Sequence, residues 1–316
     1  MHNPDGRGCG RSVGIRLSIR GYPRLLCFCG VEWRFEMTST QTPDLKALRR
    51  LAVELRQTIL RMIAKAGSGH PGGSLSMVEL LIGLYWYTLR HDPKRPDWPD
   101  RDLFLLSKGH GCPALYVVLA YQGYFPKEEL LTLRRYPTRL QGHPERWSVP
   151  GVEIASGSLG QGLSMANGIA LADRLDGRRR RIFCLMGDGE IQEGQVWEAA
   201  MTAHHHHLDR VCAIVDANQL QQNGPVKDIQ DIEPLAEKWR AFGWHAIEID
   251  GHDLAQVVKA YDEAGTVQGK PQVIVARTVK GKGVSFMELN PAWHGVAPKP
   301  DELERALEEL QRQLVK

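Results

Sequence analysis

The sequence contains no long hydrophobic run. Although hydrophobic residues make up 42% of its 316 positions, no uninterrupted apolar stretch reaches the roughly 18 residues that a membrane-spanning helix requires. The amino-terminal residues also lack the continuous apolar core of a secretory signal, and their arginines resemble an organelle transit peptide only weakly. We therefore expect neither a membrane span nor a membrane partner.

Cysteine is scarce, with six residues in the whole chain, three of which fall within the first 36 positions. The other three lie singly in apolar surroundings, at Cys112, Cys184 and Cys212. Isolated thiols in such surroundings are typical of reduced core cysteines in cytosolic proteins. We therefore expect a cytoplasmic location.

Neither sign of charge dominates the main part of the chain. The whole sequence has 40 basic and 37 acidic residues, but the first 36 positions hold six arginines against three acidic residues, which leaves 34 of each sign from Met37 onward. This balance gives no electrostatic footprint for nucleic acid, so we expect no nucleic-acid partner. We expect residues 1–36 to be a disordered leader, or to precede a true translation start at Met37, and residues 37–316 to form one domain.

Short runs rich in strand-forming residues recur along the chain, and turns with helical or polar stretches follow them. These runs span residues 103–107, 182–186, 211–216, 244–250 and 272–278. Such alternation predicts an α/β fold in which a parallel β-sheet is covered by helices on both faces. Ligands of such sheets bind outside the carboxyl ends of the strands, which is where the polar clusters of this sequence fall.

Helical periodicity is clearest in the stretch that begins at Pro43. Apolar residues at spacings of three and four predict an amphipathic helix there, with Pro43 in its first turn and Gly67 just past its end. We expect the following "GSGHPGGS" to be a loop, residues 77–89 to form a second helix, and residues 301–316 to form a surface helix.

The sequence "GDGE" places Asp188 between two glycines, directly after the run 182–186. Gly187 and Gly189 permit a tight turn and close approach of the backbone, and the following "EIQEGQVWEA" predicts a helix whose amino end points at the same spot. An anionic phosphate suits such a helix end. A carboxylate close to that phosphate would repel it unless a cation lay between the phosphate and the carboxylate. Asp188 is therefore a candidate metal ligand.

Asn218 follows the next run, in "IVDANQL", and extends the candidate metal site. The Asp188 carboxylate, the Asn218 amide oxygen and a backbone carbonyl, that of Leu220, form a hard oxygen set that suits Mg²⁺ or another divalent cation such as Ca²⁺ or Mn²⁺. Diphosphate oxygens and water would complete the coordination. An acidic turn is the more common meaning of G-D-G alone, but Asn218 at this distance favours the metal site.

Four histidines each stand beside a glycine in an expected loop. They are His70 in "SGHPGG", His110 in "SKGHG", His143 in "QGHPE" and His294 in "AWHG". A single histidine of this kind is more often a hydrogen-bonded structural residue than a catalytic one. Four in such similar surroundings indicate a shared site.

The run His204–His207 suggests a metal site at first sight. Successive residues of a helix point about 100° apart, so four adjacent side chains do not converge on one ion. We expect these histidines instead to end the helix that follows "GDGE", where imidazole suits the helix dipole.

Longer motifs join these features into one pattern. They are "SGHPGGSLS", "SKGHGCPALY", "GHPE", "GSLGQGLS", "GDGEIQEGQVWEA", "DANQLQ", "LAEKWRAFGW", "DGHD" and "GKGVSFME". From Leu45 to Pro298 the chain resembles the amino-terminal, diphosphate-binding subunit of a split transketolase, a thiamine-diphosphate enzyme. The forms "SGHPGG" and "GSLGQG" favour transketolase over the related deoxyxylulose-phosphate synthases and 2-oxoacid dehydrogenases.

The resemblance implies roles for individual residues. The metal ligands would be Asp188, Asn218 and the Leu220 carbonyl. The catalytic residues, which face the sugar, would be His70, His143 and His294. The cofactor contacts would be His110, Gly157, Ser158, Leu159, Asp188, Gly189, Asn218 and His294. Glu193 is similar to a family glutamate that is buried where active sites meet.

Two positions depart from the family pattern. Lys108, in "SKGHG", stands where many full-length enzymes have asparagine, which puts local contacts in doubt. The sequence "NQL" replaces the commoner "NGI", but the implied ligand there is a backbone oxygen, so Leu220 should serve as well.

The resemblance also implies an activity and a partner. Full-length transketolases continue into a second domain, which binds the cofactor's aminopyrimidine through a glutamate that starts catalysis. We therefore expect a separate carboxyl-terminal subunit with this pyrimidine-binding domain, joined with our chain in a heterotetramer. Together they would transfer a two-carbon ketol group from a ketose phosphate to an aldose phosphate, as in the pentose phosphate pathway, with thiamine diphosphate and Mg²⁺. The alternatives are a split ketol transferase for another sugar or sugar-acid phosphate, or a non-catalytic cofactor-binding subunit.

Overall fold

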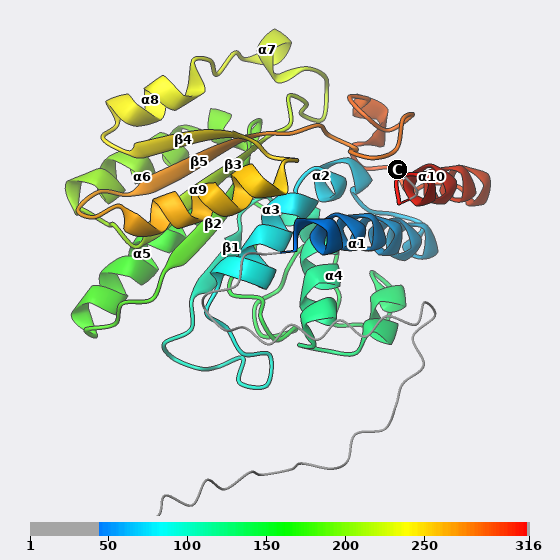
Figure 1. The fold of residues 1–316 in the computed structure, drawn as a ribbon, viewed down its shortest axis with the longest axis horizontal. Helices are drawn as coiled ribbons and strands as arrows, with labels where there is room; N and C mark the ends of the chain where they lie inside the picture. Colours follow the sequence, from blue (N-terminus) through cyan, green and yellow to red (C-terminus); the bar gives the residue numbers. More distant parts are fainter. Residues whose placement is uncertain (1–43, 315–316) are drawn as a thin grey trace, which may run out of the picture. The chain divides into compact units, whose positions relative to one another are not determined.

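The five predicted strands form one parallel sheet, in the order β1-β2-β3-β5-β4 (Figure 1). The strands are β1 (Leu103–Leu106), β2 (Ile182–Gly187), β3 (Val211–Ala217), β4 (His245–Asp250) and β5 (Gln272–Arg277). Each end agrees with the predicted run to within one residue. The predicted α/β fold with a parallel sheet is therefore confirmed.

The computed structural model describes residues 44–314 of the chain. The predictions for residues 1–36 and for Pro43 lie outside this range and stay predictions. Within the range, no helix is both long enough and apolar enough to cross a membrane.

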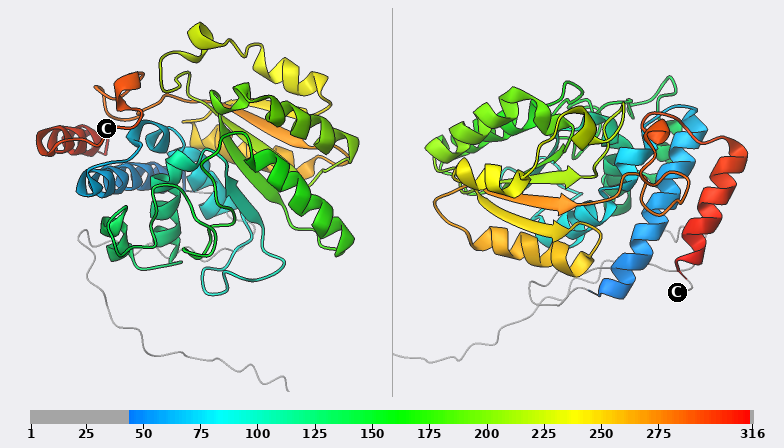
Figure 2. Two further views of the ribbon diagram at one scale, coloured as in Figure 1. Left: turned by 180° about the vertical axis from the view of Figure 1, so that it is seen from behind. Right: turned by 90° about the horizontal axis from the view of Figure 1, so that it is seen from above.

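Helices cover both faces of the sheet because successive strand residues point to opposite sides. Phe183 and Leu185 of β2 belong to one hydrophobic core, while Cys184 and Met186 belong to the other. The helices of the first core are α1 (Leu45–Ala66), α3 (Val78–Gly83), α4 (Cys112–Gln122) and α9 (Leu254–Thr266). Those of the second core are α5 (Gly162–Leu175), α6 (Gly194–His205) and α8 (Leu235–Ala241), and Figures 1 and 2 show them on the opposite side of the sheet.

The predicted amphipathic helix is confirmed as α1. It begins at Leu45 because the Asp44 carboxylate caps it, accepting from the N–H groups of Lys46 (3.0 Å) and Ala47 (3.1 Å). It ends at Ala66, and Gly67 follows as the C-cap with a φ of 71°, which suits glycine at this position. The predicted surface helix is α10 (Pro300–Arg312), which lies beside α1 (Figure 1).

The loop predicted for "GSGHPGGS" was wrong for its last four residues, which belong to the short helix α2 (Pro71–Leu75). Proline suits the first position of a helix because its fixed φ is already helical and its missing N–H is not needed there. The Ser74 hydroxyl also donates to the His70 carbonyl (2.7 Å), which closes the turn. The helix predicted over residues 77–89 is present over residues 78–88, where α3 continues as a π-helical turn, η1 (Leu84–Thr88).

Short segments complete the described elements around the sheet. They are the helix α7 (Val226–Ile229) and the 3-10 turns η2 (Gly109–Gly111), η3 (Lys127–Thr132), η4 (Glu190–Gln192) and η5 (Pro291–Trp293). The turns η2, η4 and η5 stand next to the candidate site, where they let the chain change direction sharply after a strand or loop.

Candidate active site

A cavity of about 370 Å³ opens at the carboxyl edge of the sheet. Strand β2 pairs directly with β3, and Gly187 lies opposite Asp216, so Asp188 and Asn218 follow neighbouring strands. The predicted site residues that line the cavity are His70, His110, His143, Gly157, Leu159, Asp188, Gly189, Asn218, Leu220 and His294. Residues from widely separated motifs thus meet around one space.

Ser158 is the one predicted cofactor contact that does not line this cavity. Its side chain is exposed, whereas its neighbours Gly157 and Leu159 line the cavity. The structure therefore brings together every predicted site residue except Ser158. Their roles toward cofactor, metal and sugar stay predictions.

Asp188 is buried, and both of its carboxylate oxygens accept backbone hydrogen bonds. Oδ1 accepts from the N–H of Gly189 (2.8 Å) and Oδ2 from the N–H of Gln219 (2.5 Å). Burial, together with the nearby Asp216 carboxylate, raises the pKa of Asp188 to about 7. Its contacts with residues 44–314 leave the negative charge without a paired cation, which is the condition that a bound metal ion would relieve.

Asn218 and Leu220 present neutral oxygens beside Asp188. The Asn218 Nδ2 donates to Asp216 (3.1 Å), and its Oδ1 accepts from the N–H of Leu220 (3.3 Å). Because the Asp216 carboxylate only accepts, it fixes which end of the Asn218 amide is oxygen. No group of three or more His, Cys, Asp or Glu within residues 44–314 could hold a metal. One carboxylate with neutral oxygens is instead a donor set that fits Mg²⁺, with the remaining ligands coming from water or a bound anion.

Lys280 was not among the predicted site residues, yet it lines the cavity and brings a positive charge to it. Its side chain is buried, and Nζ donates to the Leu220 carbonyl (2.8 Å) while lying 2.8 Å from His294 Nδ1. Burial and the neighbouring Lys108 lower the pKa of Lys280 to about 8. Within the described part of the chain Lys280 forms no ion pair with a carboxylate, so the cavity offers a positive charge to an anionic ligand.

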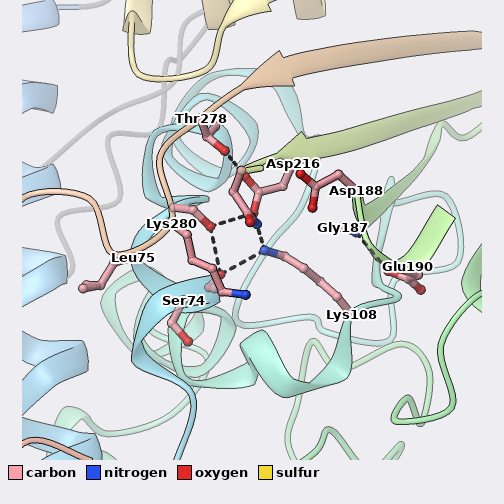
Figure 3. A network of polar contacts seen from close by, with 12 residues as sticks. Ser74, Leu75, Lys108, Gly187, Asp188, Glu190, Asp216, Thr278 and Lys280 are labelled. Carbon is pink, nitrogen blue, oxygen red and sulfur yellow. Dashed lines mark hydrogen bonds and ion pairs between the residues drawn. The ribbon is translucent and has the colours of Figure 1, made fainter. Parts of the chain in front are cut away.

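Asp216 was also missed, and it organises the floor of the site (Figure 3). Its carboxylate is fully buried and pairs with the Lys108 ammonium. Although burial opposes ionisation, Lys108 holds the pKa of Asp216 below its usual value. The other donors to this carboxylate are the Ser76 hydroxyl (2.6 Å), the Thr278 hydroxyl and the Asn218 amide (3.1 Å). Lys108 also donates to the Gly73 carbonyl (2.9 Å), so the pair ties α2 to the ends of β1, β3 and β5.

The four predicted histidines form one cluster. The ring centroid of His70 lies 5.3 Å from that of His110, 6.1 Å from that of His143 and 5.5 Å from that of His294. Burial lowers the pKa of all four imidazoles, to about 4 for both His70 and His294. Arg134 adds to this effect at His70 and His143, and Lys280 adds to it at His294. In the chain by itself these rings are therefore neutral at pH 7. A neutral imidazole can donate one hydrogen bond and accept another.

A second hollow, of about 680 Å³, adjoins the histidine cluster. His70 and His143 line both the hollow and the cavity, while Arg134, Tyr136 and Gln141 line the hollow alone. The two histidines thus stand between the cavity and the hollow.

The helix predicted to begin directly after "GDGE" was wrong at its start. The 3-10 turn η4 comes first, and α6 begins only at Gly194, with Glu193 as its N-cap. Glycine at position 189 is favoured by close approach rather than by backbone angle, because a Cβ there would lie only 3.0 Å from the Cβ of Gln221. Glu193 is exposed in the chain, so its predicted burial against another active site stays a prediction.

The histidine run ends α6, as predicted. His204 and His205 form the last turn, His206 is the C-cap, and His207 follows with a φ of 51°. Over residues 44–314, these histidines form no cluster that could hold a metal ion.

The fold is that of a thiamine-diphosphate-binding domain. Residues 47–313 match the family described as "Transketolase, thiamine diphosphate binding domain". The chain therefore belongs to the transketolase family, and the resemblance noted from the motifs is confirmed.

The relatives include proteins named as separate transketolase subunits. The chain is 46% identical to the 6-deoxy-6-sulfo-D-fructose transketolase subunit of Clostridium sp. (strain MSTE9), over 84% of its own length and 97% of that protein. It is 45% identical to an apulose-4-phosphate transketolase subunit from Actinobacillus succinogenes, over 84% of its length and 94% of that protein. The predicted kind of chain, a transketolase subunit, is thus confirmed.

Longer transketolases match only in part. The chain is 38% identical to the transketolase of Homo sapiens and covers 45% of it. The crystal structure of the Campylobacter jejuni transketolase superposes with a TM-score of 0.80 at 34% identity, over 85% of our chain and 43% of that one. The chain therefore spans less than half of these full-length proteins.

Proposed function

We propose that this chain is the diphosphate-binding subunit of a two-subunit transketolase that uses thiamine diphosphate and Mg²⁺. The observation that carries the proposal is the meeting of four neutral histidines with Asp188, Asn218 and Leu220 around one cavity. A cofactor-binding subunit without a catalytic role has no need of the histidines that line the adjoining hollow.

The chain's own residues would anchor the cofactor by its charged end. Asp188, Asn218 and the Leu220 carbonyl would hold Mg²⁺, and the Lys280 ammonium adds positive charge next to the same space. Gly157 and Leu159 of the loop before α5 would line the cofactor. When bound, thiamine diphosphate supplies an electron sink for breaking and forming the carbon–carbon bond next to a carbonyl.

The histidine cluster would handle the sugar. His70 and His143 reach both the cavity and the hollow, so they are placed to hydrogen-bond hydroxyls of a sugar bound in the hollow. A neutral imidazole has one N–H group and one acceptor nitrogen, so each of these rings could both donate a proton to the substrate and accept one from it. His294, whose Nδ1 lies beside Lys280 and whose ring centroid lies 5.5 Å from that of His70, would help to orient the substrate.

The substrate is proposed as a ketose phosphate donor with an aldose phosphate acceptor, as in the pentose phosphate pathway. A second candidate is a related anionic sugar. It is supported by the names of the relatives, which specify 6-deoxy-6-sulfo-D-fructose and apulose 4-phosphate. In both cases a two-carbon ketol group would be transferred.

The partner is proposed as a carboxyl-terminal subunit with the pyrimidine-binding domain. It is supported by the word "subunit" in the names of the relatives and by the length of full-length transketolases beyond the part that this chain matches. A two-fold symmetric heterotetramer would then contain two complete sites, each built from both kinds of chain. We propose a cytoplasmic location for this assembly.

The test is a calorimetric titration of the co-purified complex with thiamine diphosphate, with and without Mg²⁺. We expect binding that needs Mg²⁺, followed by ketol transfer when a panel of phosphorylated and sulfonated ketoses is supplied with aldose phosphates. Absence of thiamine diphosphate binding would refute the proposal, and binding that ignores Mg²⁺ would refute the metal site.

A further inference from the structure

Glu190, the first residue of η4, is a buried carboxylate whose role the site described above does not include. It is 3% exposed, and burial raises the pKa of its carboxyl group. Both of its oxygens accept hydrogen bonds: Oε1 from the Ser107 hydroxyl and the Gly160 N–H (2.9 Å), and Oε2 from the Gly187 N–H (3.0 Å). Figure 3 shows the contact between Glu190 and Gly187.

These three donors come from separate segments. Ser107 directly follows β1, Gly187 is the last residue of β2, and Gly160 lies in the loop before α5. Ser107 also holds the start of α5, directly after that loop, because its Oγ accepts from the N–H of Gly162 (3.0 Å). One carboxylate therefore joins two strand ends to the loop that contains Gly157 and Leu159.

The loop and the start of α5 pack closely against their surroundings, with no room for a side chain at Gly160 or Gly162. Gly160 has a φ of 79°, and a Cβ there would lie 2.9 Å from the Cβ of Glu193. A Cβ on Gly162 would lie 2.4 Å from the Cβ of Ser107. Without Glu190, the Gly160 and Gly187 N–H groups would lose their acceptor in a buried site, which favours movement of the loop toward water.

We propose that Glu190 is a positioning residue that holds loop 157–160 in the conformation that binds the cofactor. Both of its oxygens are committed to donors of the chain, so Glu190 acts through the loop rather than on a bound molecule. The proposal rests on the proposed function, because the cofactor is thiamine diphosphate only if that function is correct.

The main variant is Glu190→Gln in the complex with the partner subunit. A glutamine has the size of glutamate, but its amide nitrogen cannot accept, so one of the two backbone N–H groups is left without a partner. We expect the dissociation constant for thiamine diphosphate to rise about tenfold. We expect kcat at saturating cofactor to stay within about twofold, because the groups that touch the substrate are unchanged.

Hydrogen exchange measured by mass spectrometry provides a readout that needs no cofactor. In Glu190→Gln, peptides covering residues 157–163 should take up deuterium faster than in the wild type, while peptides of α10 should not change. Glu198→Gln, an exposed glutamate on α6, is the matched control and should leave both measurements unchanged. If Glu190→Gln does not fold, Ser107→Ala removes one donor to the carboxylate and the acceptor of Gly162, and should give the same two changes more weakly.

The outcomes separate the two proposals. If hydrogen exchange in residues 157–163 is unchanged in Glu190→Gln, the proposal that Glu190 positions the loop is wrong. Faster exchange with unchanged cofactor affinity overturns the link to cofactor binding. A wild-type complex that binds no thiamine diphosphate refutes the proposed function, whereas the exchange experiment still decides whether Glu190 holds the loop.

Discussion

Lys280 and His294 lie in direct contact, with the lysine Nζ 2.8 Å from the histidine Nδ1. An ammonium group can only donate, so Nδ1 of His294 accepts and its ring hydrogen is on Nε2. The same ammonium donates to the Leu220 carbonyl (2.8 Å). Lys280 thereby connects a predicted metal ligand to a predicted catalytic residue.

Replacing Lys280 by methionine should weaken cofactor binding and strengthen the fold. Loss of the charge beside the cavity should raise the dissociation constant for thiamine diphosphate about tenfold. The pKa of Lys280 is lowered from 10.5 to about 8, so its charged form destabilises the cofactor-free fold at pH 7, and this effect disappears as the pH rises from about 8 to 10.5. Lys280→Met should therefore stabilise the cofactor-free protein at pH 7 by about 1–3 kcal/mol, measured by urea unfolding.

The control for this experiment is Lys282→Met, two residues along the chain. Lys282 is half-buried and pairs only loosely with Glu288, at 3.8 Å. It should change neither quantity by a measurable amount. Equal effects of the two substitutions would contradict a special role for Lys280.

The strand ends explain why part of the site could be predicted from sequence. Asp188 and Asn218 each come directly after a run of strand-forming residues, and the ends of parallel strands meet at one edge of the sheet. Their proximity therefore follows from local patterns and one rule of topology. The histidines were found in the same way, since each stands beside a glycine near such an end or in a loop that folds over it.

Charges that depend on distant partners could not be predicted in this way. Asp216 looks like the last residue of a buried strand, and its ion pair with Lys108 joins positions 108 residues apart. Lys280 directly precedes "GKG", whose two glycines indicate a turn at the surface, and its burial results from the packing of Leu220 and His294 around it. Such contacts depend on the tertiary structure rather than on periodicity, and Glu190 was mistaken for the start of α6 for the same reason.

Asp188→Asn should remove the dependence of cofactor binding on Mg²⁺. The substitution keeps the size of the side chain and removes its charge, so Mg²⁺ should no longer strengthen thiamine diphosphate binding, and the affinity should fall at least tenfold. Calorimetric titration with and without Mg²⁺ measures both effects. Asp228→Asn, an exposed aspartate in α7, is the matched control. A variant that still binds the cofactor more tightly with Mg²⁺ would exclude Asp188 as a ligand.

The same carboxylate predicts how pH affects the metal-free protein. The pKa of Asp188 is raised from 3.8 to about 7, so its contribution to stability is fully present below pH 3.8 and is lost as the pH rises through 7. Added Mg²⁺ should therefore raise the melting temperature more at pH 8 than at pH 5. The difference should vanish in Asp188→Asn, as followed by calorimetric scans.

Substitution of His70 or His143 by glutamine should impair turnover without impairing cofactor binding. Both rings line the hollow beside the cavity, so we expect kcat/KM to fall about 10²-fold while the dissociation constant for thiamine diphosphate stays within about twofold. Steady-state kinetics with a ketose phosphate and a cofactor titration measure the two quantities. The control is His205→Gln, at the end of α6, which should change neither. Full activity of the His70 and His143 variants would remove both from the proposed mechanism.

The buried ion pair between Arg56 and Glu79 should control the stability of the fold at acidic pH. Arg56 of α1 forms two hydrogen bonds, both 2.7 Å long, with Glu79 of α3, and His252 Nδ1 lies 3.0 Å from the same carboxylate. His252 Nε2 accepts from the N–H of Val279, so its Nδ1 carries the hydrogen and donates to Glu79. This cluster therefore ties α1 and α3 to the segment that contains Lys280.

Glu79→Gln tests the cluster. Although burial opposes ionisation, Arg56 and His252 lower the pKa of Glu79 from 4.5 to about 2, so the stability it contributes is present above pH 4.5 and is lost as the pH falls toward 2. The substitution leaves Arg56 without its counter-ion, so the free energy of unfolding at pH 7 should fall by about 3 kcal/mol. The difference from wild type in urea unfolding should shrink as the pH is lowered from 4.5 to 3, whereas Glu304→Gln, an exposed control on α10, should show no difference at either pH. A difference that is the same at pH 7 and pH 3 would mean that lost packing, and not the charge of Glu79, accounts for the effect.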